Sequence, residues 1–324
     1  MSILVTGAPG FIGSHVVRAL ISRGEHVIGV DNLNDYYSTE LKRSRLQPLL
    51  DESQFEFHKC DIADHEALSR CLKNQDVTDI IHLAAQAGVR YSIENPFAYL
   101  NANLAGHLSI LELARAIKPQ HLVYASSSSI YGANTKTPFA ETDITDQPVS
   151  LYGATKKSDE LMSASYGRLY QLPQTGLRFF TVYGPQGRPD MAYWIFTEKI
   201  LRGEPIQIYN QGKMSRDFSY IDDIVSGVLA ALKRAPDQEQ AFHQIYNLGN
   251  DHPEELMTLV TLLEKSLGKE ADKEFLGMQA GDVERTWANI DKARKELGYA
   301  PKTSLAEGID RYINWRLALE NPFT

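Results

Sequence analysis

Near its start the chain reads Ile3-Leu4-Val5-Thr6-Gly7-Ala8-Pro9-Gly10-Phe11-Ile12-Gly13, a short apolar run followed by three glycines and the beginning of a helical pattern. Gly7 permits a tight turn, Gly10 lets the backbone approach a pyrophosphate, and Gly13 lets a helix pack closely on a strand. The N–H groups at the start of that helix then face the phosphates. Three glycines alone indicate only a tight turn, but their place between a strand and a helix predicts a dinucleotide site.

The second apolar run ends at Asp31, 24 residues after Gly7. A carboxylate at this place can accept both ribose hydroxyls of an adenosine, and it repels a 2′-phosphate. The residues that follow, Asn32-Leu33-Asn34, include no arginine that could bind such a phosphate. The sequence therefore favours NAD over NADP as the cofactor.

The first 180 residues alternate short β-type runs with helical segments. Continuous apolar strands joined by helices indicate a parallel sheet covered on both faces, and short right-handed connections make such a sheet doubly wound. The expected fold class is therefore α/β, with a doubly wound Rossmann sheet. Strands are expected at Ile3–Val5, His26–Val30, Phe55–Lys59, Asp79–Leu83, His121–Ala125 and Thr175–Phe179, with helices such as Phe11–Ser22 and Pro96–Lys118 between them.

After residue 180 the pattern is less regular and predicts a smaller α/β substrate domain, whose chain returns to the first domain near residues 216–248. We therefore expect an NAD-binding domain over residues 1–180 and a mostly substrate-binding domain over residues 181–324. The expected elements are helices at Ala192–Arg202, Asp222–Arg234, Glu255–Leu267 and Ser304–Leu317, and strands at Ile206–Tyr209, Arg216–Tyr220 and Gln244–Leu248.

Further strand ends should line the crevice that the glycine turn opens, because ligands of doubly wound sheets bind at the carboxyl ends of the strands. Small residues at Ala84 and Ala85 suit a close approach of the cofactor. The residues expected to contact NAD are Gly7, Gly10, Phe11, Ile12, Gly13, Asp31, Asn32, Asp61, Ile62, Leu83, Ala84, Ala85 and Gln86.

A tyrosine and a lysine four residues apart, Tyr152 and Lys156, would share one face of a helix. A nearby cation favours the ionised phenolate, and the same lysine could hold the nicotinamide ribose. The spacing also occurs at Tyr209 and Lys213, but the intervening Asn210-Gln211-Gly212 is a turn sequence and should not form a regular helix. Tyr152 and Lys156 are therefore the predicted catalytic pair.

A serine-rich stretch, Ser126-Ser127-Ser128-Ser129, ends the fifth strand. Hydroxyls at the carboxyl end of a parallel strand point into the ligand crevice. A polar loop would explain the serines equally well, but the strand position and the Tyr-x-x-x-Lys that follows favour a site.

In this order, the glycine turn, the serine-rich strand end and the Tyr152/Lys156 pair resemble the extended short-chain dehydrogenase/reductases over essentially all 324 residues. Within that group the chain is most similar to the UDP-glucuronate 4-epimerases. The segments that carry this narrower resemblance are Ala87-Gly88-Val89-Arg90-Tyr91-Ser92-Ile93-Glu94-Asn95-Pro96, Tyr183-Gly184-Pro185-Gln186-Gly187-Arg188-Pro189-Asp190-Met191-Ala192 and Gly212-Lys213-Met214-Ser215-Arg216-Asp217-Phe218-Ser219-Tyr220-Ile221-Asp222-Asp223.

The resemblance implies roles for individual residues. Ser127 would assist Tyr152 in catalysis, although related enzymes often carry threonine there, and Pro9 is less usual than alanine in the glycine turn. Asn103 would lie at the cofactor beside the catalytic pair. The residues implied to contact a UDP-sugar are Ser127, Ser128, Ser129 and Thr181 at the sugar and its carboxylate, Arg188 and Arg216 at carboxylate or diphosphate, Tyr209 at uracil, Gln279 and Asp282 at the nucleotide, and Arg90.

The reaction implied is inversion at C4 of UDP-glucuronate through a transient 4-keto sugar, with NAD regenerated in each turnover. Related dehydratases and decarboxylases carry carboxylates at the serine-rich strand end, where this chain has only Ser128 and Ser129. Two alternatives remain open: a 4-epimerase of neutral UDP-hexoses, and a non-catalytic NAD-binding protein that kept the fold.

The bulk composition limits the partners and the compartment. A net charge of −8 argues against broad binding to nucleic acid, and no apolar run approaches the roughly 18–20 residues of a membrane span. Two cysteines, read as buried thiols, and the absence of a leader fit the cytoplasm, and the nine histidines form no metal motif. A homodimer is implied by resemblance, through helices near Pro96–Lys118 and Tyr152–Leu172. Apolar residues that fit either this interface or the core are Leu104, Leu108, Ile110 and Leu111.

Overall fold

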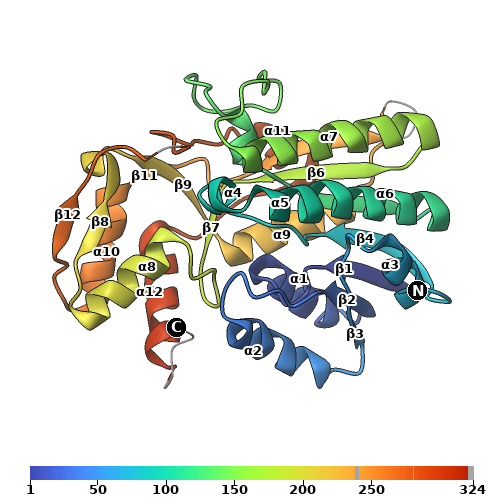
Figure 1. The fold of residues 1–324 in the computed structure, drawn as a ribbon, viewed down its shortest axis with the longest axis horizontal. Coiled ribbons are helices and arrows are strands. Elements are labelled where there is room, and N and C mark those ends of the chain that lie inside the picture. The colour runs from blue at the N-terminus through green and yellow to red at the C-terminus, as the bar shows by residue number, and fades with distance from the viewer. Residues whose placement is uncertain (238–240, 280, 320–324) are drawn as a thin grey trace.

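The computed structural model describes residues 1–237, 241–279 and 281–319, and a seven-stranded sheet forms its centre (Figure 1). The strand order is β10-β6-β5-β4-β1-β2-β3, and every neighbouring pair is parallel. This confirms the predicted doubly wound sheet. The strands are β1 (Ser2–Thr6), β2 (Val27–Asp31), β3 (Phe55–Lys59), β4 (Val77–His82), β5 (His121–Ser127), β6 (Gln174–Phe179) and β10 (His243–Leu248).

Helices cover both faces of this sheet, because its buried strands carry apolar side chains on both sides. Ile3 and Val5 of β1 pack in one core cluster with helices α1 and α9, whereas Leu4 packs in another with α3 and α6. Helix α7 lies beside α6 (Figure 1). The helices are α1 (Phe11–Ile21), α2 (Thr39–Leu50), α3 (His65–Cys71), α6 (Gly106–Ile117), α7 (Leu151–Tyr170), α9 (Ile221–Leu232) and α11 (Asp291–Leu297).

The long helix predicted over Pro96–Lys118 is broken. It begins after a short helix α4 (Tyr91–Glu94) and consists of α5 (Pro96–Tyr99), a π-helical turn η1 (Leu100–Ala105) and α6. Of the four apolar residues that fitted either core or interface, Ile110 and Leu111 are fully buried and belong to the core, whereas Leu108 is exposed. The π-turn rotates the buried face of α6 relative to that of α5. A sequence pattern interpreted with a constant helical period does not predict this rotation.

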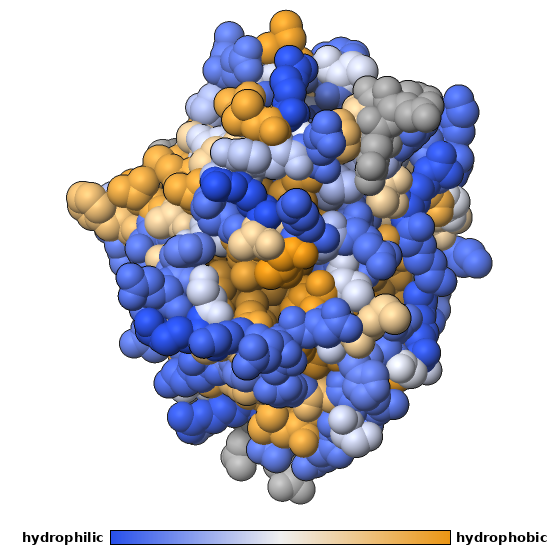
Figure 2. Space-filling model, turned by 90° about the vertical axis from the view of Figure 1, so that its right-hand side faces the viewer, coloured by the Kyte–Doolittle hydropathy of each residue, from blue (hydrophilic) through white to orange (hydrophobic). Residues whose placement is uncertain are grey.

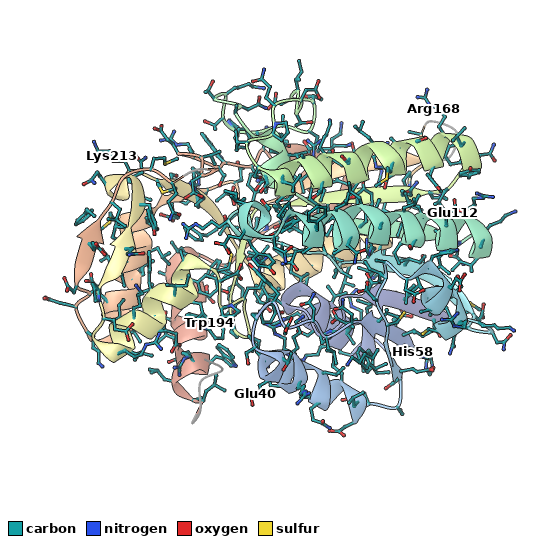
Figure 3. All side chains as sticks on the ribbon, viewed as in Figure 1. Glu40, His58, Glu112, Arg168, Trp194 and Lys213 are labelled. Carbon is teal, nitrogen blue, oxygen red and sulfur yellow. The ribbon has the colours of Figure 1, made fainter. Side chains whose placement is uncertain are left out.

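The remaining chain builds a smaller part from β7 (Thr181–Tyr183), β9 (Ser215–Tyr220) and β11 (Pro253–Glu255) in one sheet, and β8 (Ile206–Ile208) and β12 (Lys273–Phe275) in another. Its helices are α8 (Ala192–Arg202), α10 (Leu256–Leu267) and α12 (Leu305–Leu317). Trp194 of α8 is buried against Tyr312 and Trp315 of α12 (Figure 3). Between β9 and β11 the chain returns to the main sheet through α9 and β10, the edge strand of that sheet.

No helix within the described ranges is both long and apolar enough to span a bilayer. The end of the molecule at the amino ends of the parallel strands carries mostly hydrophilic residues around a central apolar area (Figure 2). Ligands of such sheets bind at the opposite edge.

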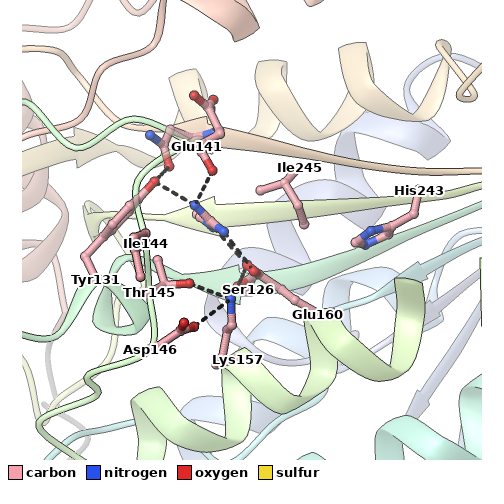
Figure 4. A network of polar contacts seen from close by, with 12 residues as sticks. Ser126, Tyr131, Glu141, Ile144, Thr145, Asp146, Lys157, Glu160, His243 and Ile245 are labelled. Carbon is pink, nitrogen blue, oxygen red and sulfur yellow. Dashed lines mark hydrogen bonds and ion pairs between the residues drawn. The ribbon is translucent and has the colours of Figure 1, made fainter. Parts of the chain in front are cut away.

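A buried ion pair fastens α7 to the main sheet (Figure 4). Arg178 of β6 donates from Nε and Nη2 to the two carboxylate oxygens of Glu160, at 2.9 and 2.8 Å. Glu160 Oε1 also accepts the Ser126 hydroxyl at 2.6 Å, and Arg178 Nη1 donates to the hydroxyl of Tyr131 at 2.9 Å. Tyr131 donates in turn to Asn247 Oδ1 of β10 at 2.7 Å. One network therefore joins α7 to β5, β6 and β10.

Replacing Glu160 by alanine leaves the Arg178 guanidinium buried without its counter-ion. Removing one partner of a buried pair destabilises by about 3–5 kcal/mol, so urea denaturation of Glu160→Ala should show a loss of about that size in the free energy of unfolding. Glu66→Ala breaks an exposed pair with Arg70 and should change little. Equal midpoints for the two variants would contradict the importance of the buried pair.

Candidate functional site

A cleft with a volume of about 240 Å³ opens at the carboxyl ends of β1, β2, β4, β5 and β6. Tyr152 and Lys156 line one side of it, and Ser127 and Arg188 also reach it. All the residues predicted to contact NAD, except Asn103, are found together in its lining: Gly7, Gly10, Phe11, Ile12, Gly13, Asp31, Asn32, Asp61, Ile62, Leu83, Ala84, Ala85, Gln86, Tyr152 and Lys156.

The glycine turn is shaped by close backbone packing. Gly7 has a φ of +71°, and a Cβ atom there would lie 2.8 Å from the backbone nitrogen of Ala84. A Cβ atom on Gly13 would lie 2.0 Å from the carbonyl oxygen of Gly7. Gly10 is the N-cap of α1 and has no side chain to bond the first-turn amides, which stay available to an anion. This cradle fits the pyrophosphate of a dinucleotide.

Pro9, the unusual residue of the turn, is held through its carbonyl. Arg45 of α2 is fully buried and donates from Nη1 to the Pro9 oxygen at 3.3 Å. The same guanidinium donates to the carbonyls of Gln186 and Gly187 and to the hydroxyl of Tyr37. Arg45 therefore ties three loops together around the pyrophosphate end of the cleft.

Asp31 stands where β2 ends, as its predicted role requires. Its Oδ1 accepts the backbone N–H of Leu33 at 2.6 Å, which fixes the carboxylate at the cleft wall. Burial raises the pKa of Asp31, and the nearby Lys42 opposes this rise. The neighbouring Asn32 donates to Asp61 Oδ2 at 3.0 Å and so joins the ends of β2 and β3. The wall offers carboxylate oxygens to ribose hydroxyls.

The predicted catalytic pair, Tyr152 and Lys156, lies in the first two turns of α7. Ser150 caps the helix by accepting the Gly153 N–H at 3.1 Å, which fixes the position of Tyr152. The Tyr152 ring meets Tyr99 edge to face, with centroids 6.0 Å apart. Lys156 Nζ donates to the Ala125 carbonyl and to Asp159 Oδ2, both at 3.1 Å. An ammonium group has three N–H donors, so the third can reach a ligand.

The second Tyr-x-x-x-Lys sequence, from Tyr209 to Lys213, does not form the α-helix that would place both side chains on one face. Tyr209 begins a short 3₁₀ segment, η3 (Tyr209–Gly212), in which Asn210 and Gln211 have positive φ values of 49° and 51°. Lys213 follows this turn, so it does not lie one α-helical turn from Tyr209 on a shared face. The expectation from the turn sequence is confirmed.

Asn103 lies in the π-turn, behind the cleft wall. Its Oδ1 accepts the Gln86 N–H at 2.8 Å, and its Nδ2 donates to the Gln86 carbonyl and to Thr155 Oγ1 at 3.0 and 2.9 Å. The side chain is buried, and both polar ends are engaged by protein. Its geometry therefore suits positioning of Gln86 and α7 rather than the direct cofactor contact expected from resemblance.

A second pocket, of about 130 Å³, continues from the serine-rich strand end. Ser127 caps the 3₁₀ helix η2 (Ser128–Tyr131) by accepting the Ser129 N–H at 3.1 Å. While Ser127 faces the first cleft, the next two serines face the second pocket. The substrate residues predicted there and found in its lining are Ser128, Ser129, Thr181, Arg216 and Asp282.

Near this pocket the structure gathers the residues predicted for the nucleotide. The Arg90 guanidinium lies 5.0 Å from the Tyr209 ring centroid and 3.6 Å from Asp282. Burial lowers the pKa of Arg216, whose Nη1 donates to the carbonyl of Ser215 at 2.9 Å. Gln279 Oε1 is buried and has no partner among the described residues. Such an orphaned acceptor fits a ligand that donates a hydrogen bond.

Arg188 is not beside Arg216. It lines the first cleft, where Nε donates to Asp190 Oδ1 at 3.0 Å, and Tyr36 donates to the other oxygen of Asp190 at 3.0 Å. Tyr36 and Asp190 were missed from the sequence, as was Asp159 beside Lys156. Two spacings in the sequence could have indicated these ion pairs: i, i+2 for Arg188 and Asp190, and i, i+3 for Lys156 and Asp159.

Comparisons with known proteins agree with this geometry. The profile of the NAD dependent epimerase/dehydratase family matches residues 3–249. UDP-glucuronate 4-epimerase 4 of Arabidopsis thaliana is 49% identical over 335 residues, covering 98% of this chain and 76% of that protein. The crystal structure of the UDP-glucuronic acid 4-epimerase from Bacillus cereus, with UDP-glucuronic acid and NAD, has a TM-score of 0.91 and 36% identity, covering 97% of this chain and 98% of that one.

A further solved structure has a different substrate. The UDP-glucose 4-epimerase from Thermotoga maritima, with UDP-glucose, has a TM-score of 0.88 and 33% identity, covering 98% of this chain and 99% of that one. The family predicted from the motifs is confirmed, and with it the predicted cofactor. The chain belongs to the NAD dependent epimerase/dehydratase family.

Proposed function

We propose that this protein is a UDP-glucuronate 4-epimerase, which converts UDP-glucuronate to UDP-galacturonate. The observation that carries the proposal is the division of one strand end between two pockets. Ser127 faces the cleft of Tyr152 and Lys156, whereas Ser128 and Ser129 face the second pocket. Residues 1–180, with the returning segments near 216–248, would then hold NAD, and residues 181–324 would mostly hold the substrate.

In this mechanism Tyr152 acts as a phenolate and takes the proton of the sugar 4′-hydroxyl. Lys156 stabilises the phenolate charge, and Ser127 orients or relays the proton. Bound NAD supplies the hydride acceptor at C4 and the hydride donor for the return step. After the 4-keto sugar has turned in the pocket, Tyr152 returns its proton to the C4 oxygen.

The hydroxyl-lined pocket favours epimerisation over elimination or decarboxylation. Those reactions need an acid or base close to C5 or C6 to carry a proton. At this position the strand end offers the hydroxyls of Ser128 and Ser129 instead of carboxylates. The carboxylate in the lining of the second pocket is Asp282, which is paired with Arg90. A 4-keto uronic acid is a β-keto acid and loses CO₂ readily. We infer that the serine hydroxyls and Thr181 hold the carboxylate out of line with the carbonyl π system.

The test is product analysis with UDP-glucuronate and no added NAD, because a cofactor regenerated in each turnover can stay bound. UDP-galacturonate should form, and Tyr152→Phe should lose at least about 100-fold in rate, the lower end of what general base catalysis contributes, while still binding NAD. A UDP-pentose as the main product would refute the proposal.

The second candidate is a 4-epimerase of neutral UDP-hexoses, supported by the similarity to the Thermotoga maritima enzyme. In that case the arginines would contact only the diphosphate. Turnover of UDP-glucose measured beside UDP-glucuronate separates the two, since our proposal requires faster conversion of the uronate. Absence of turnover with every UDP-sugar, in a protein that binds NAD, would instead favour a non-catalytic role.

We propose a homodimer as well, formed through α5, η1, α6 and α7, which lie on the same side of the main sheet (Figure 1). Large apolar side chains are exposed along these elements, among them Phe97 (77% exposed), Leu100, Leu108 and Leu161 (60%). Large apolar side chains exposed on neighbouring helices favour a protein interface.

Charge placed on this surface should separate the protomers. Phe97→Glu combined with Leu161→Glu is expected to shift the mass measured by light scattering from dimer to monomer. Ile144→Glu is the matched control, because Ile144 is 76% exposed but lies in the loop between η2 and α7. A wild-type protein that is monomeric at high concentration would contradict the proposal.

We further propose a cytoplasmic location. Cys60 is a buried free thiol, and Cys71 is a half-buried one rather than the fully buried thiol expected. Free thiols fit a reducing compartment. The sugar-nucleotide substrate is consistent with this assignment.

A further inference from the structure

A buried carboxylate touches the catalytic lysine. Asp159 lies three residues after Lys156 on α7 and is 0% exposed. Its Oδ2 accepts a hydrogen bond from Lys156 Nζ at 3.1 Å, and both side chains of this pair are buried. The other oxygen, Oδ1, has no hydrogen-bond partner in the part of the chain that the structure describes. An uncompensated carboxylate oxygen in the interior is unfavourable, so a functional reason for this residue is expected.

The charged groups nearest to Asp159 on its own helix are Lys156 and Glu160. Glu160 is engaged by the Arg178 guanidinium, which accounts for both of its oxygens. Its charge is therefore balanced within its own pair. Among the residues that the structure describes, Lys156 pairs with no carboxylate besides Asp159, since its other partner is the neutral carbonyl of Ala125.

The histidines and the tyrosine that face this region from neighbouring elements are neutral near pH 7, and the cation that faces it, Arg178 of β6, is paired with Glu160. Burial lowers the pKa of His82 on β4 to about 3 and that of His243 on β10 to about 4, and it lowers the pKa of His107 on α6 as well. Burial also raises the pKa of Tyr124 on β5 far above its usual range. Asp159 is thus the anion that acts most directly on the Lys156 ammonium.

A lysine cation stabilises a neighbouring phenolate, and a carboxylate bonded to that lysine offsets part of its field. Resting on the function proposed above, we propose that Asp159 is a positioning residue for the epimerase reaction: its carboxylate holds the Lys156 ammonium against β5 and, while ionised, weakens the stabilisation of the Tyr152 phenolate. Gain of a proton by Asp159 therefore strengthens that stabilisation.

The direction of the pH effect follows from burial. Burial raises the pKa of Asp159 to about 6, so the carboxyl gains its proton as the pH falls through that region. The Lys156 charge is then no longer offset, and the phenolate persists to lower pH than it would beside a permanently ionised carboxylate. Asp159 would thus extend activity toward acidic pH. Above about pH 6, where it is ionised, it would reduce the stabilisation that Lys156 gives to the Tyr152 phenolate.

The test is an ultraviolet titration of the Tyr152 phenolate in the full-length protein. Each protein is compared with its own Tyr152→Phe partner, so that the other tyrosines cancel. In Asp159→Asn the carboxylate charge is absent at every pH, and the phenolate signal should be half-developed about one pH unit lower than in the unaltered protein. The acid limb of the pH–rate profile should move in the same direction, with little change in KM.

Asp146→Asn is the matched control. Asp146 also lies near α7, 3.9 Å from Lys157, but its side chain is 75% exposed, so removing its charge should leave both profiles in place. Asp159→Ser provides a second variant should the asparagine protein fail to fold. An unchanged phenolate titration in either variant, or a shift to higher pH, would overturn the proposal. Because the titration needs no turnover, it remains decisive even if UDP-galacturonate is not the product.

Discussion

The bidentate contact between Arg178 and Glu160 governs the rest of the site, because α7 carries Tyr152 and Lys156, the proposed catalytic pair, and this contact sets where α7 lies. Glu160 is one helical turn beyond Lys156 and two turns beyond Tyr152, so all three project from nearly the same face. Fixing Glu160 on β6 and β5 therefore fixes the lysine against the Ala125 carbonyl. Asn103 of the π-turn η1 adds a second attachment at Thr155.

A parallel sheet supplies the other half of the geometry. Its strands all end at one edge, where β1, β2 and β4 shape a cradle that fits a dinucleotide. There β5 supplies the hydroxyl of Ser127 to the first cleft, and η2, which follows it, supplies those of Ser128 and Ser129 to the second pocket. The change of direction between Ser127 and Ser128, where β5 gives way to a 3₁₀ turn, marks the border between the two pockets, which the proposed function assigns to cofactor and sugar. A reacting carbon placed at that border meets the tyrosine, the lysine and a hydroxyl together.

Much of this could be predicted because the signals are local. The glycine turn, the strand ends and the Tyr152/Lys156 pair depend on spacing within one or two elements. The strands that were predicted lie within about two residues of their expected places, whereas the three-residue strands β7, β11 and β12 were not predicted. What was missed depends on contacts between distant segments. Asp190 accepts a hydrogen bond from Tyr36, which is distant in the sequence. Asn103 points inward because a π-turn shifts the faces of the helix. Ile110 and Leu111 likewise face the core, which constant periodicity left undecided.

The edge strand β10 has a consequence for how the chain can be made. It pairs with β6 along its whole length, although more than sixty residues separate the two strands in sequence. During synthesis the backbone edge of β6 therefore emerges from the ribosome long before its neighbour exists. A fragment that stops near residue 180 would keep this edge bare, and it would tend to aggregate rather than persist as an independent nucleotide-binding unit.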